Sequence, residues 1–341
     1  MPHRLTRQTL CDLVWSEPMR TLATKYGISD RGLAKACAAS KIPVPERGYW
    51  AKLQARQRVS KTPLPPRALG QSDEITIGRS SYWSFSESDA DVLNTPIPPP
   101  PVFEEDMETI RVRVAVMVTK APLPRKWGGH THHLIGNLLE ADRVRAQKEQ
   151  AKWGSSVSWA VPVFGTRFEM RRLNILNGLF LCLGFCGTHP TISRKEGRNL
   201  SVLVGDTRVS FYLDAAGAEK QLERERMGYG FQARDHDARM LLSISSWDSR
   251  RSWQDKQGDR IEKHLREIAI ELIVAGEQQY RDGVIRRREW LIQRKKDLEE
   301  REGRYSLDGL GDRGHQNCTP GDWVVTGRQT SQDQFQTPFS N

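Results

Sequence analysis

The strongest constraint on the fold of this chain lies in residues 18–38, where two helix-forming stretches flank one glycine. The pattern predicts a helix that begins at Pro18 and ends at Gly27, and a second helix capped by Ser29. Two helices that cross closely need a small residue at the crossing and apolar residues before, within and after the turn. This chain supplies Leu22, Ala23, Ile28 and Leu33 at those places. A helix before them, capped by Thr6, predicts a three-helix N-terminal module.

The stretch from Pro18 to Cys37 resembles the DNA-binding helix-turn-helix of bacterial regulators over the full length of that motif. The resemblance implies that the helix after Ser29 enters the major groove of double-stranded DNA. Ser29, Arg31 and Lys35 lie outside the predicted buried face of that helix, so we expect them to reach bases or phosphates. Arg31 is the best candidate for base recognition, because a guanidinium can donate two hydrogen bonds to guanine. The alternative is that Arg31 and Lys35 only solvate an outward face.

The positive charge of the chain is concentrated in its first fifth. The whole chain carries a formal net charge of +10, and residues 1–67 contain 13 Lys or Arg against 4 Asp or Glu. After the three helices, prolines predict an extended, Pro-rich arm that suits a phosphate backbone or a minor groove. Its expected DNA-binding residues are Lys41, Arg47, Lys52, Arg56 and Arg58. We expect the neighbouring Tyr49 and Trp50 to fold back over the helices instead of contacting DNA.

Residues 4–61 also resemble, most clearly at 13–19 and 42–53, the N-terminal region of a group of uncharacterised bacterial proteins. No activity is established for that group, so the resemblance implies no site residues. It does favour a bacterial origin for the module.

Composition divides the rest of the chain. Residues 68–105 are rich in Ser, Asp, Thr and Pro, which indicates a linker after the module at 1–67. Residues 106–302 predict an α+β domain with a small antiparallel sheet, including a hairpin at 200–213, and a long charged C-terminal helix. Residues 112–118 fit a strand or a helix. Residues 303–341 predict a disordered tail. The fold class is therefore mainly α with α+β.

The sequence offers little evidence of catalysis. His130, His132 and His133 form a cluster, but no Cys, Asp or Glu lies near enough in sequence to complete a zinc site. The five cysteines are scattered, and the common phosphate-loop, esterase and metalloprotease motifs are missing. We therefore expect no catalytic residues, no metal and no cofactor.

Together these patterns predict a cytoplasmic DNA-binding protein, such as a regulator or an accessory factor of a mobile element. The apolar stretch at 176–186 is too short to cross a bilayer, so we expect no membrane partner. A homodimer through the long C-terminal helix is the other expected assembly. Two alternatives stay open, namely a nucleic-acid-processing enzyme with unidentified catalytic residues and a protein–protein interaction module.

Overall fold

The structure is a computed structural model that describes residues 3–78, 88–124, 130–153, 161–193, 197–218, 223–224, 227, 234–245 and 250–311. The chain divides into two compact units. The first combines residues 1–87 with 98–289, and the second combines residues 88–97 with the chain from Trp290 onward. Each unit is described by itself.

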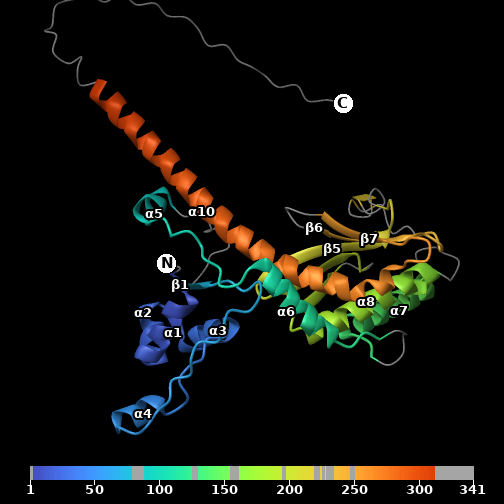
Figure 1. The fold of residues 1–341 in the computed structure, drawn as a ribbon, viewed down its shortest axis with the longest axis horizontal. Helices are drawn as coiled ribbons and strands as arrows, with labels where there is room; N and C mark the ends of the chain where they lie inside the picture. Colours follow the sequence, from blue (N-terminus) through green and yellow to red (C-terminus); the bar gives the residue numbers. More distant parts are fainter. Residues whose placement is uncertain are drawn as a thin grey trace, which may run out of the picture. The chain divides into compact units, whose positions relative to one another are not determined.

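The N-terminal part of the first unit contains three short helices and a two-stranded sheet (Figure 1). The helices are α1 (Arg7–Ser16), α2 (Met19–Lys25) and α3 (Asp30–Ala39), and the strands are β1 (His3–Thr6) and β2 (Glu74–Ile77). The caps agree with the sequence pattern. The Thr6 hydroxyl accepts a hydrogen bond from the Thr9 amide, Ser29 does the same for Gly32, and Gly27 ends α2 at φ +62°.

The core of this part extends beyond the three helices. Leu10, Val14, Leu22 and Leu33 are fully buried, and they share this core with the buried Ile75 and Ile77 of β2. Strand β2 pairs antiparallel with β1, with Ile75 opposite Leu5. The range 68–105, which composition indicates as a linker, therefore contributes a strand to the N-terminal core.

The expected extended arm contains a short helix, α4 (Tyr49–Gln54). The arm is tied to α1 at its start, since the indole Nε1 of Trp15 donates to the Pro43 carbonyl at 3.0 Å. Tyr49 packs edge-on against Trp15, and Trp50 packs edge-on against Tyr49. The Tyr49 ring thus folds back on α1, as the sequence analysis favours.

An α+β fold makes up the rest of the first unit (Figure 1). Its antiparallel sheet keeps the sequence order β3-β4-β5-β6-β7. The strands are β3 (His189–Ser193), β4 (Asn199–Val204), β5 (Thr207–Ala215), β6 (Met240–Ser245) and β7 (Arg250–Gln254). The helices are α6 (Met107–Thr119), α7 (His133–Trp153) and α8 (Arg167–Phe185), with short turns η2 (Val163–Gly165) and η3 (Ile261–Lys263).

The sequence prediction is confirmed for this class of fold and for the hairpin of β4 and β5, whose partners run from Leu200–Phe211 to Val204–Thr207. Residues 112–118, which fitted either a strand or a helix, belong to α6. Strands β3 and β7 were not expected, because short strands rich in polar residues have no clear alternation of apolar side chains.

A long helix, α10 (Leu265–Gly311), follows the sheet and confirms the predicted C-terminal helix. In the second unit, α5 (Asp89–Asn94) meets α10 through an ion pair between Asp89 and Arg294 at 2.6 Å, beside the buried Val92 and Leu298. Residues 303–311 of the tail predicted to be disordered belong to α10, and the rest of that range, 312–341, lies outside the described residues. Among the helices in the described part of the chain, none combines the length and apolar character needed to cross a membrane.

Candidate nucleic-acid interface

Helix α3 buries one face and exposes the opposite one. Leu33 and Cys37 are completely buried against α1 and α2, whereas Arg31 and Lys35 are exposed. Positions 31 and 35 are one helical turn apart and lie about 160° around the helix from Leu33. Both cations therefore project together from the outer face of α3, opposite the core that contains Leu33.

Ser29, the third expected contact of α3, is exposed but already has a local role. Its hydroxyl oxygen accepts a hydrogen bond from the Gly32 amide at 3.1 Å and so caps the helix. The hydroxyl hydrogen stays available to a phosphate oxygen, because accepting a bond does not consume the donor.

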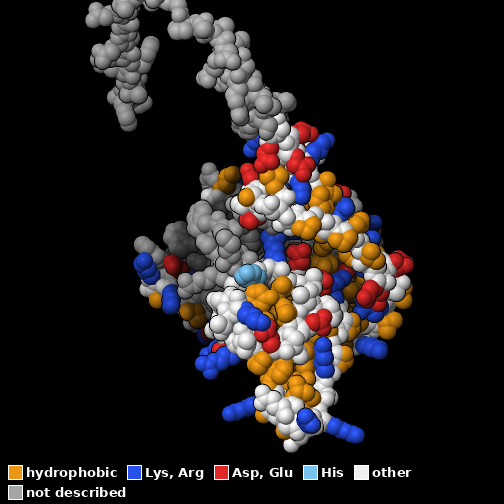
Figure 2. Space-filling view, turned by 90° about the vertical axis from the view of Figure 1, so that its left-hand side faces the viewer, with side chains coloured by type: hydrophobic (Ala, Val, Ile, Leu, Met, Phe, Trp, Pro, Cys, Tyr) orange, Lys and Arg blue, Asp and Glu red, His pale blue; other side chains and the backbone are white. Residues whose placement is uncertain are grey.

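The cations of the arm are exposed as well. Figure 2 shows Lys and Arg side chains projecting from the lower end of the molecule, which α4 and its flanks form. The expected contacts in this group are all exposed, and they are Lys41, Arg47, Lys52, Arg56 and Arg58. Within the described part of the chain, none of these five side chains and neither cation of α3 forms an ion pair.

Two of these cations occupy unusual backbone positions. Lys41 and Arg56 have φ of 54° and 55°, in the left-handed region that glycine usually fills. Each is the residue that closes a helix: the Ile42 amide donates to the Cys37 carbonyl after α3, and the Gln57 amide donates to Lys52 after α4. A basic residue thus stands at two helix ends where glycine would cost less free energy.

Two acids of the N-terminal part, Asp12 and Glu17, form ion pairs with lysines. Lys25 pairs with Glu17 at 2.7 Å, and Lys61 pairs with Asp12 at 3.3 Å. Hydrogen bonds from the Gln8 and Lys61 side chains hold the pKa of Asp12 below its usual range, so this carboxylate stays ionised. Neither acid neutralises the exposed cations of α3 and α4.

Two arginines of the N-terminal module join separate segments of the fold and are not exposed. Arg7 is buried, and its guanidinium donates to the carbonyls of Ser40 at 3.0 Å and Pro65 at 3.3 Å. It therefore joins the C-terminus of α3 to the end of the arm. Arg67 forms an ion pair with the buried Glu277 of α10. Local net charge alone could not distinguish these anchoring arginines from exposed ones.

Arg20 is a cation of this surface that the sequence analysis did not select. It is exposed on the first turn of α2, and no described residue forms an ion pair with it. The first helix of a helix-turn-helix crosses the DNA backbone, so a basic residue there was a usable signal.

The histidine cluster has a structural explanation. The side chain of Asn177 accepts from the His132 amide at 2.7 Å and donates to the His130 carbonyl at 3.1 Å, which fixes this loop on α8. Burial, and then the neighbouring His133, lower the pKa of His132, so its ring is neutral at pH 7. Among the described residues, no three His, Cys, Asp or Glu side chains gather closely enough to hold a metal ion.

Comparison of the chain with protein-family models, with curated proteins and with solved structures gave no match.

Proposed function

We propose that this chain binds double-stranded DNA through a helix-turn-helix formed by α2 and α3 and through the basic surface of the arm. One observation carries the proposal: Arg31 and Lys35 project together from the outer face of α3, and neither forms an ion pair with any described residue. The left-handed Gly27 and the buried Ala23 support the motif, because they allow α2 and α3 to cross after a short turn.

In this arrangement α3 enters the major groove and Arg31 reads a base edge, while Lys35 and the arm contact phosphates. The basic surface comprises Arg20, Arg31, Lys35, Lys41, Arg47, Lys52, Arg56 and Arg58. If most of these cations contact phosphates, the logarithm of the binding constant falls with the logarithm of salt concentration at a slope of about −4 to −7.

The first prediction concerns this basic surface. Fluorescence anisotropy of labelled duplex DNA titrated with the full chain tests it. Arg31→Ala combined with Lys35→Ala should weaken binding about tenfold or more and make the salt slope shallower by about 1, since Lys35 is the phosphate contact of this pair. The matched control is Arg143→Ala with Lys148→Ala, which removes two exposed cations from α7. The control should retain the affinity of the parent chain.

Equal losses in both double variants would mean that net charge, and not α3, drives binding. Absence of measurable binding by the parent chain at low salt would overturn the proposal. Tight binding of a protein partner with little salt dependence would instead favour the protein–protein alternative.

The proposal includes a homodimer through α10, whose exposed apolar side chains include Ile285, Trp290 and Ile292. Two copies would place two recognition helices on neighbouring half-sites. Light scattering of the full chain measures its oligomeric state directly. A monomer at the concentrations that bind DNA would remove the dimer from the proposal.

A further inference from the structure

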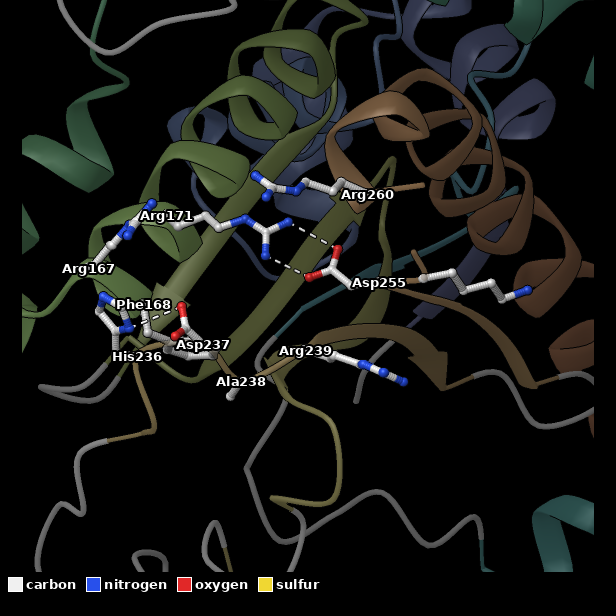
Figure 3. Close-up of a pocket in the computed structure, with 10 residues that line it drawn as sticks. Arg167, Phe168, Arg171, His236, Asp237, Ala238, Arg239, Asp255 and Arg260 are labelled. Atoms are coloured by element: carbon white, nitrogen blue, oxygen red, sulfur yellow. Dashed lines mark hydrogen bonds and ion pairs between the residues drawn. The ribbon is translucent and has the colours of Figure 1, made fainter. Parts of the chain in front are cut away.

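A cavity of about 180 Å³ opens in the α+β part of the first unit, outside the N-terminal basic surface (Figure 3). Residues from the start of α8, from the segment before β6 and from the segment between β7 and η3 line it. The lining contains five cations and two acids, and it comprises Arg167, Phe168, Arg171, His236, Asp237, Ala238, Arg239, Asp255, Lys256 and Arg260.

The floor of this cavity is a fixed ion pair. The guanidinium of Arg171 donates to both carboxylate oxygens of Asp255, at 2.6 and 3.0 Å, and to both oxygens of Glu262, at 2.8 and 2.7 Å. Asp255 also accepts from the amides of Met240 and Ile261, so each of its oxygens already has two donors. Burial would raise the pKa of Asp255, but the bonds from Arg171 and these amides hold it below its usual range.

The other acid of the lining is also engaged. Asp237 lies 3.0 Å from Nδ1 of His236, at the exposed edge of the cavity. Four cations thus remain with no ion pair among the described residues, and they are Arg167, Arg239, Lys256 and Arg260. A positive field is concentrated in a concave site that its own acids cannot neutralise.

Figure 3 labels three of these four cations. Arg167 and Arg260 flank Arg171 from α8 and from the segment before η3, whereas Arg239 extends along the rim. All four side chains are exposed, so their rotamers can change when a ligand enters.

The geometry points to a phosphate-binding site, with Arg167 and Arg260 as the principal contacts and Arg239 and Lys256 at the rim. Arginine suits this role because its planar donors match the oxygens of a phosphate group. The only aromatic carbon ring of the lining belongs to Phe168, which is 2% exposed and gives a nucleobase no surface to stack on.

The size of the cavity further limits which ligands can bind. Its volume lies below the roughly 300 Å³ at which pockets for whole drug-sized ligands begin. It therefore fits one or two phosphate groups rather than an enclosed nucleotide. These groups belong either to a small phosphorylated compound or to a DNA backbone, and the two sources separate experimentally.

The second prediction is tested by isothermal titration of the full chain with inorganic pyrophosphate at low salt. Arg167→Gln combined with Arg260→Gln should weaken pyrophosphate binding at least about tenfold, because two charge-assisted contacts are lost. The control with Arg143→Ala and Lys148→Ala should bind as the parent chain does. Thermal melting of each variant verifies that these exposed substitutions leave the fold intact.

The Arg31→Ala, Lys35→Ala variant separates this site from the proposed DNA surface, since it should keep full pyrophosphate affinity. An unlabelled duplex added at saturation identifies the source: displacement of pyrophosphate assigns the site to backbone phosphates, and retention assigns it to a small phosphorylated ligand. No pyrophosphate binding by the parent chain, or equal binding by the Arg167, Arg260 variant, would overturn the inference.

Discussion

Lys41 adds a positive charge to the surface and adopts a strained backbone conformation. It closes α3 at φ 54°, and its amide donates to the Ala38 carbonyl at 3.1 Å. A non-glycine residue in this region costs about 1 to 2 kcal/mol relative to the right-handed region. The residue therefore contributes charge at a helix end where glycine would stabilise the fold better.

The third prediction separates the effect of the Lys41 charge from the effect of its backbone strain. Lys41→Gly should raise the free energy of unfolding by about 1 kcal/mol, since the strain disappears while the helix end is kept. The same variant should weaken DNA binding and make the salt slope shallower by about 1, because one phosphate contact is lost. Denaturant unfolding and fluorescence anisotropy measure the two effects.

Lys41→Ala provides the matched control, because it removes the charge and retains the strained backbone. It should lower DNA affinity as Lys41→Gly does, without the gain in stability. An unchanged salt slope in both variants would exclude Lys41 from the interface.

At the scale of elements, two glycines of α10 that look alike in the sequence differ in the structure. A Cβ on Gly276 would lie 2.5 Å from Cβ of the buried Val204, whereas a Cβ on Gly283 would have no neighbour within 4 Å. Helix α10 can thus approach β4 closely only because residue 276 has no side chain. The sequence alone does not distinguish the two glycines, because the close approach of β4 leaves no signal in the residues around Gly276.

The fourth prediction compares these positions directly. Gly276→Ala should lower the free energy of unfolding by about 1 to 3 kcal/mol, because α10 or β4 must move to admit the methyl group. Gly283→Ala should raise it by about 0.5 to 1 kcal/mol, since alanine favours an exposed helix. Chemical denaturation of the two variants tests the pair, and a stabilised Gly276→Ala variant would contradict the close contact.

At the scale of the whole molecule, the sequence predicts what local patterns determine. Caps such as Thr6 and Ser29, the turn at Gly27 and the hairpin of β4 and β5 follow from neighbouring residues, and all are present. The exposure of Arg31 follows from its spacing to Leu33. The candidate DNA surface was therefore mostly predictable, apart from Arg20.

Contacts between residues far apart in sequence were not predictable. Charged side chains usually lie on the surface, yet Glu169 and Asp214 are completely buried. Glu169 accepts from Arg198 at 2.6 Å, and Asp214 accepts from the same guanidinium at 2.8 Å. The phosphate cavity escaped notice for the same reason, because its cations come from three separate segments.

The attachment of the arm to α10 is the long-range feature with the clearest consequence. Glu277 is completely buried and accepts from the Arg67 guanidinium, from the Gly70 amide at 2.7 Å and from Arg281 at 2.9 Å. The carbonyl of Gly70 in turn accepts from the Asp206 amide, at the turn after β4, at 3.0 Å. One carboxylate thus organises the segment that leads from the arm to β2.

The ionisation of Glu277 gives this attachment a pH dependence. Burial would raise its pKa, but the hydrogen bonds from Arg67, Gly70 and Arg281 hold it below its usual range. A carboxyl whose pKa is lowered by folding stabilises the fold fully above its unfolded pKa of about 4.3, and this contribution is lost as pH falls through the lower folded value.

The fifth prediction follows from the lowered pKa of Glu277. Glu277→Gln should lower the free energy of unfolding by about 3 kcal/mol at pH 7, because Arg67 and Arg281 keep their charges beside a neutral amide. The difference from the parent chain should shrink as pH falls from about 4.3 through the lower folded pKa, where the carboxyl of the folded parent chain becomes protonated too. Residues 67–73 should also exchange amide hydrogens faster, since the Gly70 amide loses a charged acceptor. Denaturant unfolding across pH and hydrogen exchange measure these effects, and a difference that stays constant down to pH 2 would show that Glu277 stabilises this segment by its shape and not by its charge.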